Sequence, residues 1–532
     1  MRKNFVIGRL KIFSSPVIFF FIIIFLFPTL VYAAGNYNET LAVRCSNGIF
    51  VGSEKKGAVG YIGVPYAKQP VGDLRWKAPE QPTPSDKIFI ADKPSVMPLQ
   101  ILGGNKKFDA NKIGEDCLKL NIWLNPNNRD KKKAVMVYFH GGAYMRGNIN
   151  TPLLNGENFV RENDDVILIV VGYRLGMMGF IDLSNVEGGE NFPDSACLGL
   201  LDQIQALRWI NENIAAFGGD PDNVTIFGHS AGGSSVSFLM SMPEARKYFN
   251  RCIAQSGTVF FSHSPQFCQR LPQELLRVSG AKNMDELMNL STEELYNLMP
   301  QLGEYFTFPE RDGKHLPSRM FEAFERGDTK KIDLLIGTAS DEWRLWLLFS
   351  KNMQDFHANT LKVIDYAKAQ LPPKDLRLIE KFMARQYGEA VWKDSELLDE
   401  IIFNRPAFKQ ANLHSAAGGK TFVYHWKYKT GSDETDAFHG AELVEIFGNP
   451  IDNYRYKSYR YDAALAKKVQ RMWVNFAKTG NPSTEDFVWP RYDRKHRATV
   501  VFDNEIFVER DSEKAGDLLA PLMDLQFDML VK

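Results

Sequence analysis

One segment constrains the fold of this chain more than any other, because an apolar strand runs through a glycine-rich turn straight into a helix. Val224–Phe227 predicts the strand, Gly228-His229-Ser230-Ala231-Gly232 the turn, and the small residues of Gly233–Met240 the helix. Glycines two residues before and after Ser230 permit a sharp turn. Such a turn exposes the Ser230 hydroxyl above the sheet, beside helix N–H groups that favour negative charge. We interpret Ser230 as a nucleophile; a glycine-rich turn with an incidental serine is the alternative.

The rest of the chain alternates between strand-like and helix-like patterns. Val166–Val171 is a continuous apolar run of strand length, whereas Leu201–Ile214 has apolar residues at helical spacing. Further strands are predicted at Ala134–Phe139, Arg251–Gln255, Leu334–Gly337, Thr421–Tyr428 and Ala498–Phe502 (the last at a sheet edge), and further helical regions at 265–330, 352–416 and Leu465–Thr479. We therefore expect an α/β fold with a large, mostly parallel central sheet, helices on both faces and helical insertions.

The charge balance excludes one broad class of partner. The chain has 532 residues, with 64 Lys and Arg against 64 Asp and Glu, so its formal net charge is zero. Nucleic-acid binding needs a basic excess, so no nucleic-acid partner is expected. No linker rich in Ser, Gly or Pro and no repeat of solenoid length interrupts the sequence. We predict that residues 34–532 form a single domain.

The first residues have the pattern of an export signal. Arg2 and Lys3 begin a positively charged stretch, Pro16–Leu30 is almost wholly apolar, and small residues lead up to Ala33. This order is typical of a signal peptide, here residues 1–33, cut after Ala33, which predicts a secreted or periplasmic protein. An uncleaved N-terminal anchor is the alternative, because the apolar run is nearly long enough to span a bilayer. We expect no stable membrane span after cleavage.

The cysteine count is odd for an exported chain. The five cysteines are Cys45, Cys117, Cys197, Cys252 and Cys268, so at least one thiol is free or pairs between chains. Their spacing matches no zinc pattern, and no metal is expected. Cys252 with Cys268 is the first pair to test for a disulfide.

A second glycine-rich segment follows the strand that ends at Phe139. His140-Gly141-Gly142-Ala143 has the composition of a loop whose backbone a substrate can approach closely. We expect the N–H groups of Gly141, Gly142 and Ala231 to form an oxyanion hole; a tight turn without a catalytic role is the alternative. His140 itself is expected to fix the loop by a hydrogen bond.

A serine nucleophile of this type needs a histidine base and an acid that follow it in the chain. His439 lies in a loop after the strand Thr421–Tyr428, and loops at strand ends carry chemistry. The other histidines in this part of the chain, which we expect to be structural, are His357, His414, His425 and His496. The acid should follow the strand that ends at Gly337, where Asp341 and Glu342 both remain candidates. Its role would be to orient the imidazole and stabilise the imidazolium.

Several further motifs resemble those of the type-B carboxylesterase/lipase family, which includes cholinesterases and carboxylesterases. They are Tyr61–Ala67, Pro70–Trp76, Glu115–Ile122, Leu200–Gln203, Phe217–Pro221 and Val224–Gly233. The resemblance implies the α/β-hydrolase fold and an enzyme that cleaves carboxylic esters through an acyl-enzyme, with no cofactor. Carried over by position, the family pattern Gly-x-x-x-Asp-Glu selects Glu342 as the acid. The family's histidine precedes a glycine, as His439 does, and its oxyanion hole implies Gly141, Gly142 and Ala231.

The chain also departs from the family pattern. His229 stands where many members have Glu, Trp343 where Gly is common, and Cys197 where Asn is usual. The stretch Val96–Glu115 lacks the Trp and the second Cys of cholinesterases, which argues against choline esters and leaves Cys117 without its family partner.

The resemblance and the residues together predict a hydrolase for a small, mostly apolar ester. A lipase, thioesterase or amidase of the same family is one alternative. A non-catalytic, cholinesterase-like binding protein is the other, although such proteins usually lack a member of the catalytic triad. Aromatic pairs such as Phe260-Phe261 and the run Trp343–Phe349 are expected to be core rather than substrate wall.

Overall fold

The computed structural model describes residues 37–101, 107–127, 131–302, 307–429, 434–450, 461–511, 516–524 and 528. The chain divides into two compact units, Met1–Tyr37 and Asn38–Lys532. The predicted signal peptide, residues 1–33, lies outside the described residues.

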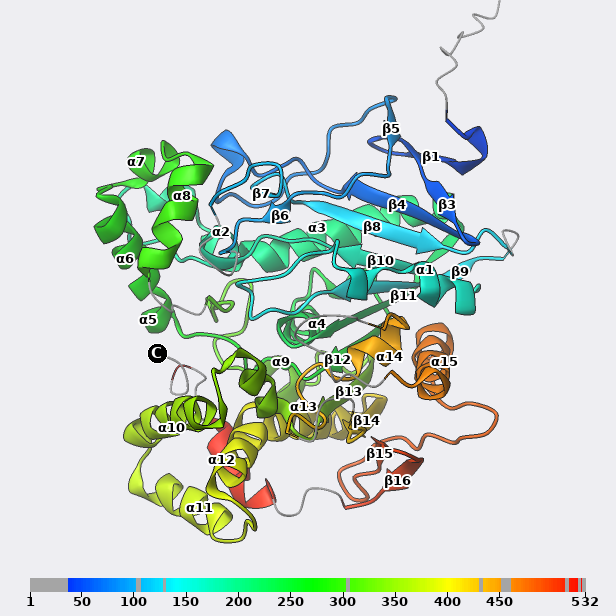
Figure 1. The fold of residues 1–532 in the computed structure, drawn as a ribbon. Coiled ribbons are helices and arrows are strands. Elements are labelled where there is room, and N and C mark those ends of the chain that lie inside the picture. Colours follow the sequence, from blue (N-terminus) through cyan, green and yellow to red (C-terminus); the bar gives the residue numbers. More distant parts are fainter. Residues whose placement is uncertain are drawn as a thin grey trace, which may run out of the picture. The chain divides into compact units, whose positions relative to one another are not determined.

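An eleven-stranded sheet forms the centre of this unit (Figure 1). In spatial order its strands are β16 (Ile506–Glu509), β15 (Thr499–Phe502), β14 (Thr421–Trp426), β13 (Asp333–Ala339), β12 (Arg251–Gln255), β11 (Gly219–His229), β9 (Lys133–Phe139), β10 (Val166–Val171), β8 (Lys119–Leu124), β4 (Ala58–Pro65) and β3 (Ser53–Lys55). Every pairing from β15 through to β10 is parallel, and the outer strands pair antiparallel. The predicted mostly parallel sheet is confirmed.

The central strands are buried because helices cover them on both sides. All residues of β9 and β10 are buried, as expected for parallel strands with near-continuous apolar sequence. The helices are α1 (Glu157–Glu162), α2 (Gly176–Gly179), α3 (Leu198–Asn213), α4 (Ala231–Ser241), α5 (Pro265–Cys268), α6 (Arg270–Ser279), α7 (Met284–Met288), α8 (Thr292–Leu298), α9 (Glu322–Glu325), α10 (Met353–Gln370), α11 (Pro373–Met383), α12 (Ala390–Leu398), α13 (Arg405–Ala416), α14 (Leu443–Phe447) and α15 (Ala463–Thr479).

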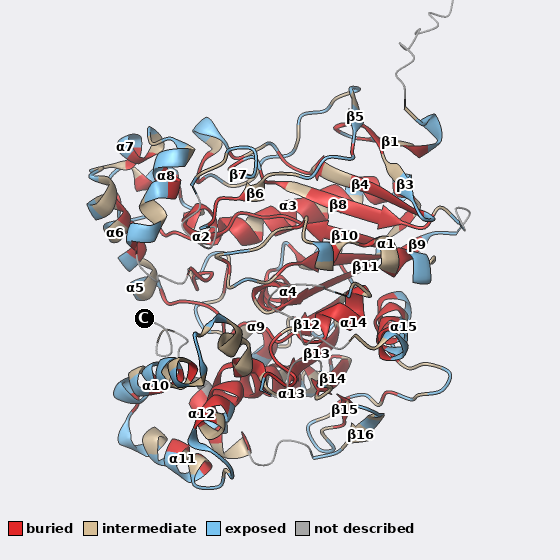
Figure 2. Cartoon of the chain, viewed as in Figure 1, coloured by how far each residue is buried: buried red, intermediate tan, exposed pale blue. Residues whose placement is uncertain are grey.

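The two faces of the sheet have different partners. On one face, alternate residues such as Met136 and Tyr138 of β9 join a continuous core with α1, α14 and α15. On the other face, α4 packs on β11 and β12, α3 contacts α4, and Gln410 of α13 donates a hydrogen bond to Ser237 of α4. Figure 2 shows the buried strands between these layers, with exposed surface concentrated on inserted helices such as α7 and α11.

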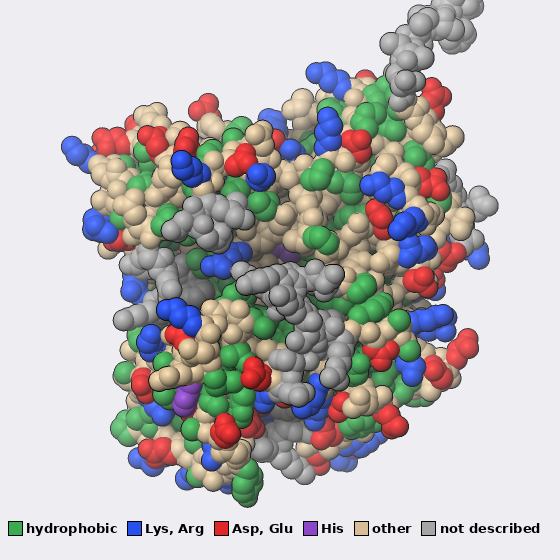
Figure 3. Space-filling model, in the orientation of Figure 1, with side chains coloured by type: hydrophobic (Ala, Val, Ile, Leu, Met, Phe, Trp, Pro, Cys, Tyr) green, Lys and Arg blue, Asp and Glu red, His purple; other side chains and the backbone are tan. Residues whose placement is uncertain are grey.

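Two smaller sheets and two groups of inserted helices complete the unit. One sheet joins β1 (Ala42–Cys45), β2 (Gly48–Val51) and β5 (Ile88–Ile90), and the other joins β6 (Met97–Pro98) to β7 (Ile113–Gly114). Helices α5–α9 and α10–α13 occupy the regions predicted to be mainly helical. On the face shown in Figure 3, Lys and Arg side chains are interspersed with Asp and Glu, in keeping with the zero net charge.

Two expectations were wrong. Ala498–Phe502 was expected to be an edge strand, but β16 pairs antiparallel with β15 and forms the edge instead. The expected disulfide between Cys252 and Cys268 is absent, and all five cysteines, which lie in the described part, are free. Cys252 lies within the central strand β12, where its side chain is enclosed by the core, whereas Cys268 ends α5.

In the described part of the chain, no helix combines the length and apolarity needed to cross a bilayer.

Candidate active site

The turn at Ser230 is a sharp strand-to-helix turn with a strained backbone. β11 ends at His229, α4 begins at Ala231, and Ser230 between them has φ 59° and ψ −124°. A non-glycine residue at positive φ is costly and persists only where its surroundings impose it. The Ser230 N–H donates to the Gln255 carbonyl at 2.8 Å, which ties the turn to the end of β12. The predicted strand, turn and helix therefore occur as a nucleophile elbow.

The two glycines of the elbow are required by close packing. A Cβ on Gly228 would lie 2.5 Å from the Gly232 backbone, and one on Gly232 would lie 1.9 Å from the Phe139 carbonyl oxygen. Both distances are too short for any side chain. These glycines therefore let the elbow close against the end of β9, where the second glycine loop begins.

That second loop lies directly beside the serine. A Cβ on Gly141 would be 2.6 Å from the His229 carbonyl oxygen and 3.1 Å from Ser230 Cβ. The loop then turns through Gly142, whose φ is +120°. No described residue accepts a hydrogen bond from the N–H groups of Gly141, Gly142 or Ala231. N–H donors without an acceptor among the described residues, on a loop beside a serine, are what an oxyanion hole requires.

His140 holds this loop in place. Its Nδ1 lies 2.9 Å from the Gly141 carbonyl oxygen, its ring stacks on Tyr173 with centroids 4.5 Å apart, and Tyr173 Oη donates to its carbonyl at 2.6 Å. Burial lowers the pKa of His140 to about 4, so the ring is neutral at pH 7 and Nδ1–H can donate. These are the contacts expected of a residue that fixes the loop.

Glu342 and His439 form a buried contact. Glu342 Oε2 lies 2.5 Å from His439 Nδ1, although 97 residues separate the two in the chain. Glu342 begins the 3₁₀ helix η9 (Glu342–Phe349), soon after β13, and His439 lies in the loop after β14. Asp341, the alternative acid, turns instead to Arg344 at 3.0 Å. The structure thus brings Glu342, and not Asp341, to the imidazole.

The second oxygen of Glu342 has two donors of its own. Ser256 Oγ donates to Oε1 at 2.5 Å, and the Ala339 N–H donates at 2.7 Å. Sequence reasoning missed Ser256. It follows β12 directly, and a Ser-Gly pair at the carboxyl end of a parallel strand is a signal that could have drawn attention to it.

His229, the residue before Ser230, packs against His439. The rings of His229 and His439 have centroids 4.3 Å apart, and Gly440 packs on the His229 ring. His439 therefore adjoins the residue that precedes Ser230. Among the described residues, none forms a hydrogen bond with His439 Nε2, the nitrogen that would face the serine. Catalytic hydrogen bonds of this kind often tighten only when substrate is bound.

Burial sets the protonation of the pair. Burial lowers the pKa of His439, so the imidazole is neutral at pH 7 and can accept a proton. Burial also raises the pKa of Glu342, while the hydrogen bonds from Ser256 and Ala339 oppose that rise by stabilising the carboxylate. The pKa of His229 is likewise lowered, first by burial and then by the neighbouring His439.

The other histidine candidates have partners elsewhere. His357 Nε2 contacts Asp394 at 2.8 Å, His414 Nδ1 contacts Thr421 Oγ1 at 2.8 Å, and the exposed His496 contacts Asp493 at 2.9 Å. His425 is buried within β14, and burial lowers its pKa to about 4. These surroundings fit the structural roles predicted for them.

Aromatic rings surround the imidazole on its other sides. Phe403 lies 4.8 Å and Trp346 lies 6.1 Å from the His439 ring, measured between centroids, and Phe403 contacts Phe261 at 5.6 Å. Phe403 belongs to the π-helical turn η10 (Asp399–Asn404), a kind of distortion that is frequent at functional sites. Phe261 is buried, as predicted for a core residue, and Trp346 is half-buried; both lie in the ring cluster that borders His439.

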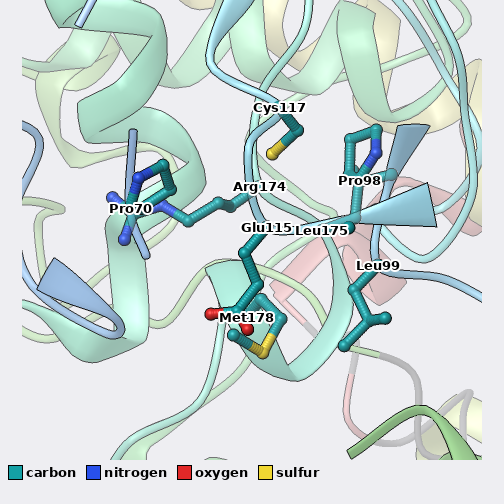
Figure 4. A pocket seen from close by; sticks show the side chains of 9 residues that line it. Pro70, Pro98, Leu99, Glu115, Cys117, Arg174, Leu175 and Met178 are labelled. Carbon is teal, nitrogen blue, oxygen red and sulfur yellow. The ribbon is translucent and has the colours of Figure 1, made fainter. Parts of the chain in front are cut away.

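The N-terminal motifs contribute buried ion pairs to the fold rather than residues to the candidate active site. Arg75 and Glu115 form a buried ion pair at 2.7 Å, and Arg174 and Asp202 form another at 2.6 Å. Glu115 and Arg174 line a small cavity together with the Cys117 thiol (Figure 4). Burial disfavours the Cys117 thiolate and raises its pKa, so this cysteine behaves as a buried apolar residue.

Comparison with known proteins decides the family. The model of the carboxylesterase family matches residues 39–516, which is most of the chain. The protein is a member of the carboxylesterase family. The esterase is 36% identical over 479 residues to the para-nitrobenzyl esterase of Bacillus subtilis (strain 168), covering 87% of this chain and 94% of that protein. It is 29% identical over 473 residues to carboxylesterase 1C of Rattus norvegicus, covering 82% and 84%.

Solved structures agree with the sequence comparison. The carboxylesterase of Geobacillus stearothermophilus at pH 6.2 has a TM-score of 0.79 and 29% identity, covering 90% of this chain and 99% of that one. The predicted α/β-hydrolase fold and the predicted family are therefore confirmed, and the esterase is a serine hydrolase of carboxylic esters.

Proposed function

We propose that the esterase cleaves small, mostly apolar carboxylic esters through an acyl-enzyme, with Ser230 as nucleophile, His439 as base and Glu342 as the orienting acid. The single observation that carries this proposal is the 2.5 Å contact of Glu342 with His439 Nδ1, in a buried site next to the elbow. An imidazole held by a carboxylate on one nitrogen can accept a proton on the other.

Acylation begins at the Ser230 hydroxyl. Its oxygen attacks the ester carbonyl carbon while its proton passes to His439 Nε2. The carbonyl oxygen becomes an oxyanion, which the N–H groups of Gly141, Gly142 and Ala231 stabilise. These donors have no competing acceptor among the described residues, so they need no rearrangement to serve it.

Release of the alcohol completes the first half of the reaction. The bond from the carbonyl carbon to the alcohol oxygen breaks, and the proton on His439 Nε2 passes to that oxygen. Water then attacks the acyl-serine, gives a proton to His439, and displaces Ser230, which takes the proton back. Throughout, the Glu342 carboxylate stabilises the imidazolium, and Ser256 holds that carboxylate in place.

The surroundings of His439 support an apolar substrate. Phe403 and Trp346 flank the imidazole, and Phe261 extends this wall away from it. Aromatic rings next to the reacting atoms favour an apolar acyl or alcohol group.

The similarity to a para-nitrobenzyl esterase makes nitrobenzyl and nitrophenyl esters the natural first substrates. A panel that also contains long-chain glycerides, thioesters and amides will rank the alternative activities.

We also propose that the mature esterase begins after Ala33, is exported to the periplasm or medium, and folds as a single domain over residues 34–532. The start of the compact unit Asn38–Lys532 and the start of the family match at residue 39 support this division. Intact-mass measurement of the exported protein tests it, because cleavage predicts an N-terminus at Ala34 and an uncleaved anchor predicts the full chain.

Labelling with a fluorophosphonate probe tests the catalytic assignment. The probe should label the wild-type esterase and leave Ser230→Ala unlabelled and inactive. Ser234→Ala is the matched control, because Ser234 is a buried serine one turn along α4 and should remain labelled. Labelling that survives in Ser230→Ala would disprove the nucleophile.

A further inference from the structure

The acid and the base lie on two neighbouring loops that are joined by backbone hydrogen bonds. Asp341 and Phe438 form a parallel bridge, the Asp341 N–H donates to the Ala437 carbonyl at 3.1 Å, and the His439 N–H donates to the Glu342 carbonyl at 3.3 Å. The position of His439 relative to Glu342 therefore depends on how closely these two loops stay paired.

Arg344 joins the same two loops through its side chain. Its guanidinium lies 3.0 Å from an oxygen of Asp341 and 2.5 Å from an oxygen of Asp436. Asp341 directly precedes Glu342, and Asp436 lies three residues before His439. One cation thus neutralises a carboxylate on the loop of the acid and a carboxylate on the loop of the base.

The ion cluster formed by Arg344, Asp341 and Asp436 is largely shielded from water. The side chains of Arg344, Asp341 and Asp436 are 17%, 19% and 10% exposed. Arg344 also lies over the Trp392 ring, with its guanidinium carbon 4.2 Å from the ring centroid. A planar guanidinium fixed between two carboxylates and an aromatic face is more specific than an exposed ion pair.

We propose that Arg344 is a positioning residue, which holds the His439 loop against the Glu342 loop so that the imidazole stays aligned for proton transfer. This inference rests on the proposed roles of Glu342 and His439. Asp436 also pairs with Lys429 at 3.0 Å, but only Arg344 contacts both Asp341 and Asp436, so its removal takes away the cation that joins the two loops and leaves the two carboxylates facing each other. The loops then separate, and displacement of a catalytic group by about 1 Å is enough to lower the rate about a hundredfold.

The decisive variants are Arg344→Gln and Arg344→Lys, measured per active site. Titration with a fluorophosphonate counts reactive serines, so kcat per titrated site excludes losses caused by misfolded protein. We expect Arg344→Gln to lower kcat by at least about tenfold with KM changed by less than about threefold, because the loop affects proton transfer more than binding. Arg344→Lys keeps the charge and should recover part of the loss.

Asp436→Asn provides an independent readout from the other loop. If the two residues act through one contact, the kcat per site of the double variant Arg344→Gln/Asp436→Asn should be close to that of the slower single variant. Arg326→Gln is the matched control, since Arg326 also joins two carboxylates, those of Glu322 and Asp328, on and beside α9. The control should keep the wild-type kcat per site.

Any of three results would overturn the proposal. The first is a kcat per site in Arg344→Gln within about twofold of wild type. The others are losses of kcat in Arg344→Gln and Asp436→Asn that multiply in the double variant, and a loss of kcat in Arg326→Gln equal to that in Arg344→Gln. Should Arg344→Gln fail to fold, Arg344→Lys and Asp436→Asn decide, because an unaltered kcat in both also overturns it. Activity that survives in Ser230→Ala would refute the proposed function instead, so the two failures are distinguishable.

Discussion

Replacing Glu342 by Gln tests the acid more sharply than any other single change, because the two oxygens of this carboxylate have different partners. Oε1 accepts hydrogen bonds from Ser256 Oγ and the Ala339 N–H, and Oε2 faces His439 Nδ1. In the Gln variant the amide oxygen should keep the two donors. The amide NH₂ then faces His439 Nδ1, which stabilises the tautomer that carries its proton on Nε2. That tautomer cannot accept the Ser230 proton.

The expected loss follows from the charge and the tautomer together. Removing a carboxylate whose charge lies about 4 Å from the imidazolium costs roughly 4 kcal/mol of transition-state stabilisation at an effective dielectric of 20. That corresponds to about a thousandfold, and the wrong tautomer can bring the loss to about ten-thousandfold.

The assay is kcat/KM on a nitrophenyl ester, with active sites counted by titration. Asp341→Asn is the comparison that discriminates, because Asp341 contacts Arg344 rather than the imidazole and should lose only about tenfold. The reasoning is refuted if Glu342→Gln keeps more than about a tenth of wild-type kcat/KM, or if Asp341→Asn is the more damaging change.

Three further predictions follow from the same site. Because burial lowers the pKa of His439, activity should fall on acidification only at an apparent pKa below 6.5, where the base becomes protonated; a pH profile of kcat/KM with its acidic limb at or above 6.5 would contradict this. Ser256→Ala removes a donor to Glu342 Oε1 and should lower kcat about tenfold with little change in KM, so steady-state kinetics with an unchanged kcat would exclude a role in holding the acid. Gly141→Ala would place its Cβ 2.6 Å from the His229 carbonyl oxygen and displace the loop donors, with an expected loss of about a hundredfold in kcat; a rate near wild type would mean that this loop does not stabilise the oxyanion.

Several parts of the site could be predicted because their causes are local. The elbow at Ser230 depends on two glycines and on the strand and helix beside them, so the sequence shows it directly. The loop at Gly141 and Gly142 is visible for the same reason, since it directly follows a continuous apolar strand. His439 could be singled out only by its place after a strand, and its role remains a prediction that the contact with Glu342 supports.

Other parts depended on contacts that no local pattern contains. The residues alone left Asp341 and Glu342 open, because adjacent carboxylates after a strand look alike until one of them meets the imidazole. Phe261 is buried, as predicted for a core residue, but its place with Trp346 in the ring cluster that borders His439 could not be predicted, since apolar rings at such spacings are common to cores and to substrate walls alike.

Short-range sterics dictate the buried parallel strands, the elbow and the glycine loops, so these elements can be recognised in the amino-acid sequence without the fold. Which side chains meet depends on the assembled fold. The contact of Glu342 with His439 spans 97 residues, that of Ser256 with Glu342 spans 86, and that of Arg344 with Asp436 spans 92. Each of these contacts exists because parallel strands end at the same edge of one sheet, which is a property of the assembled fold and not of any segment.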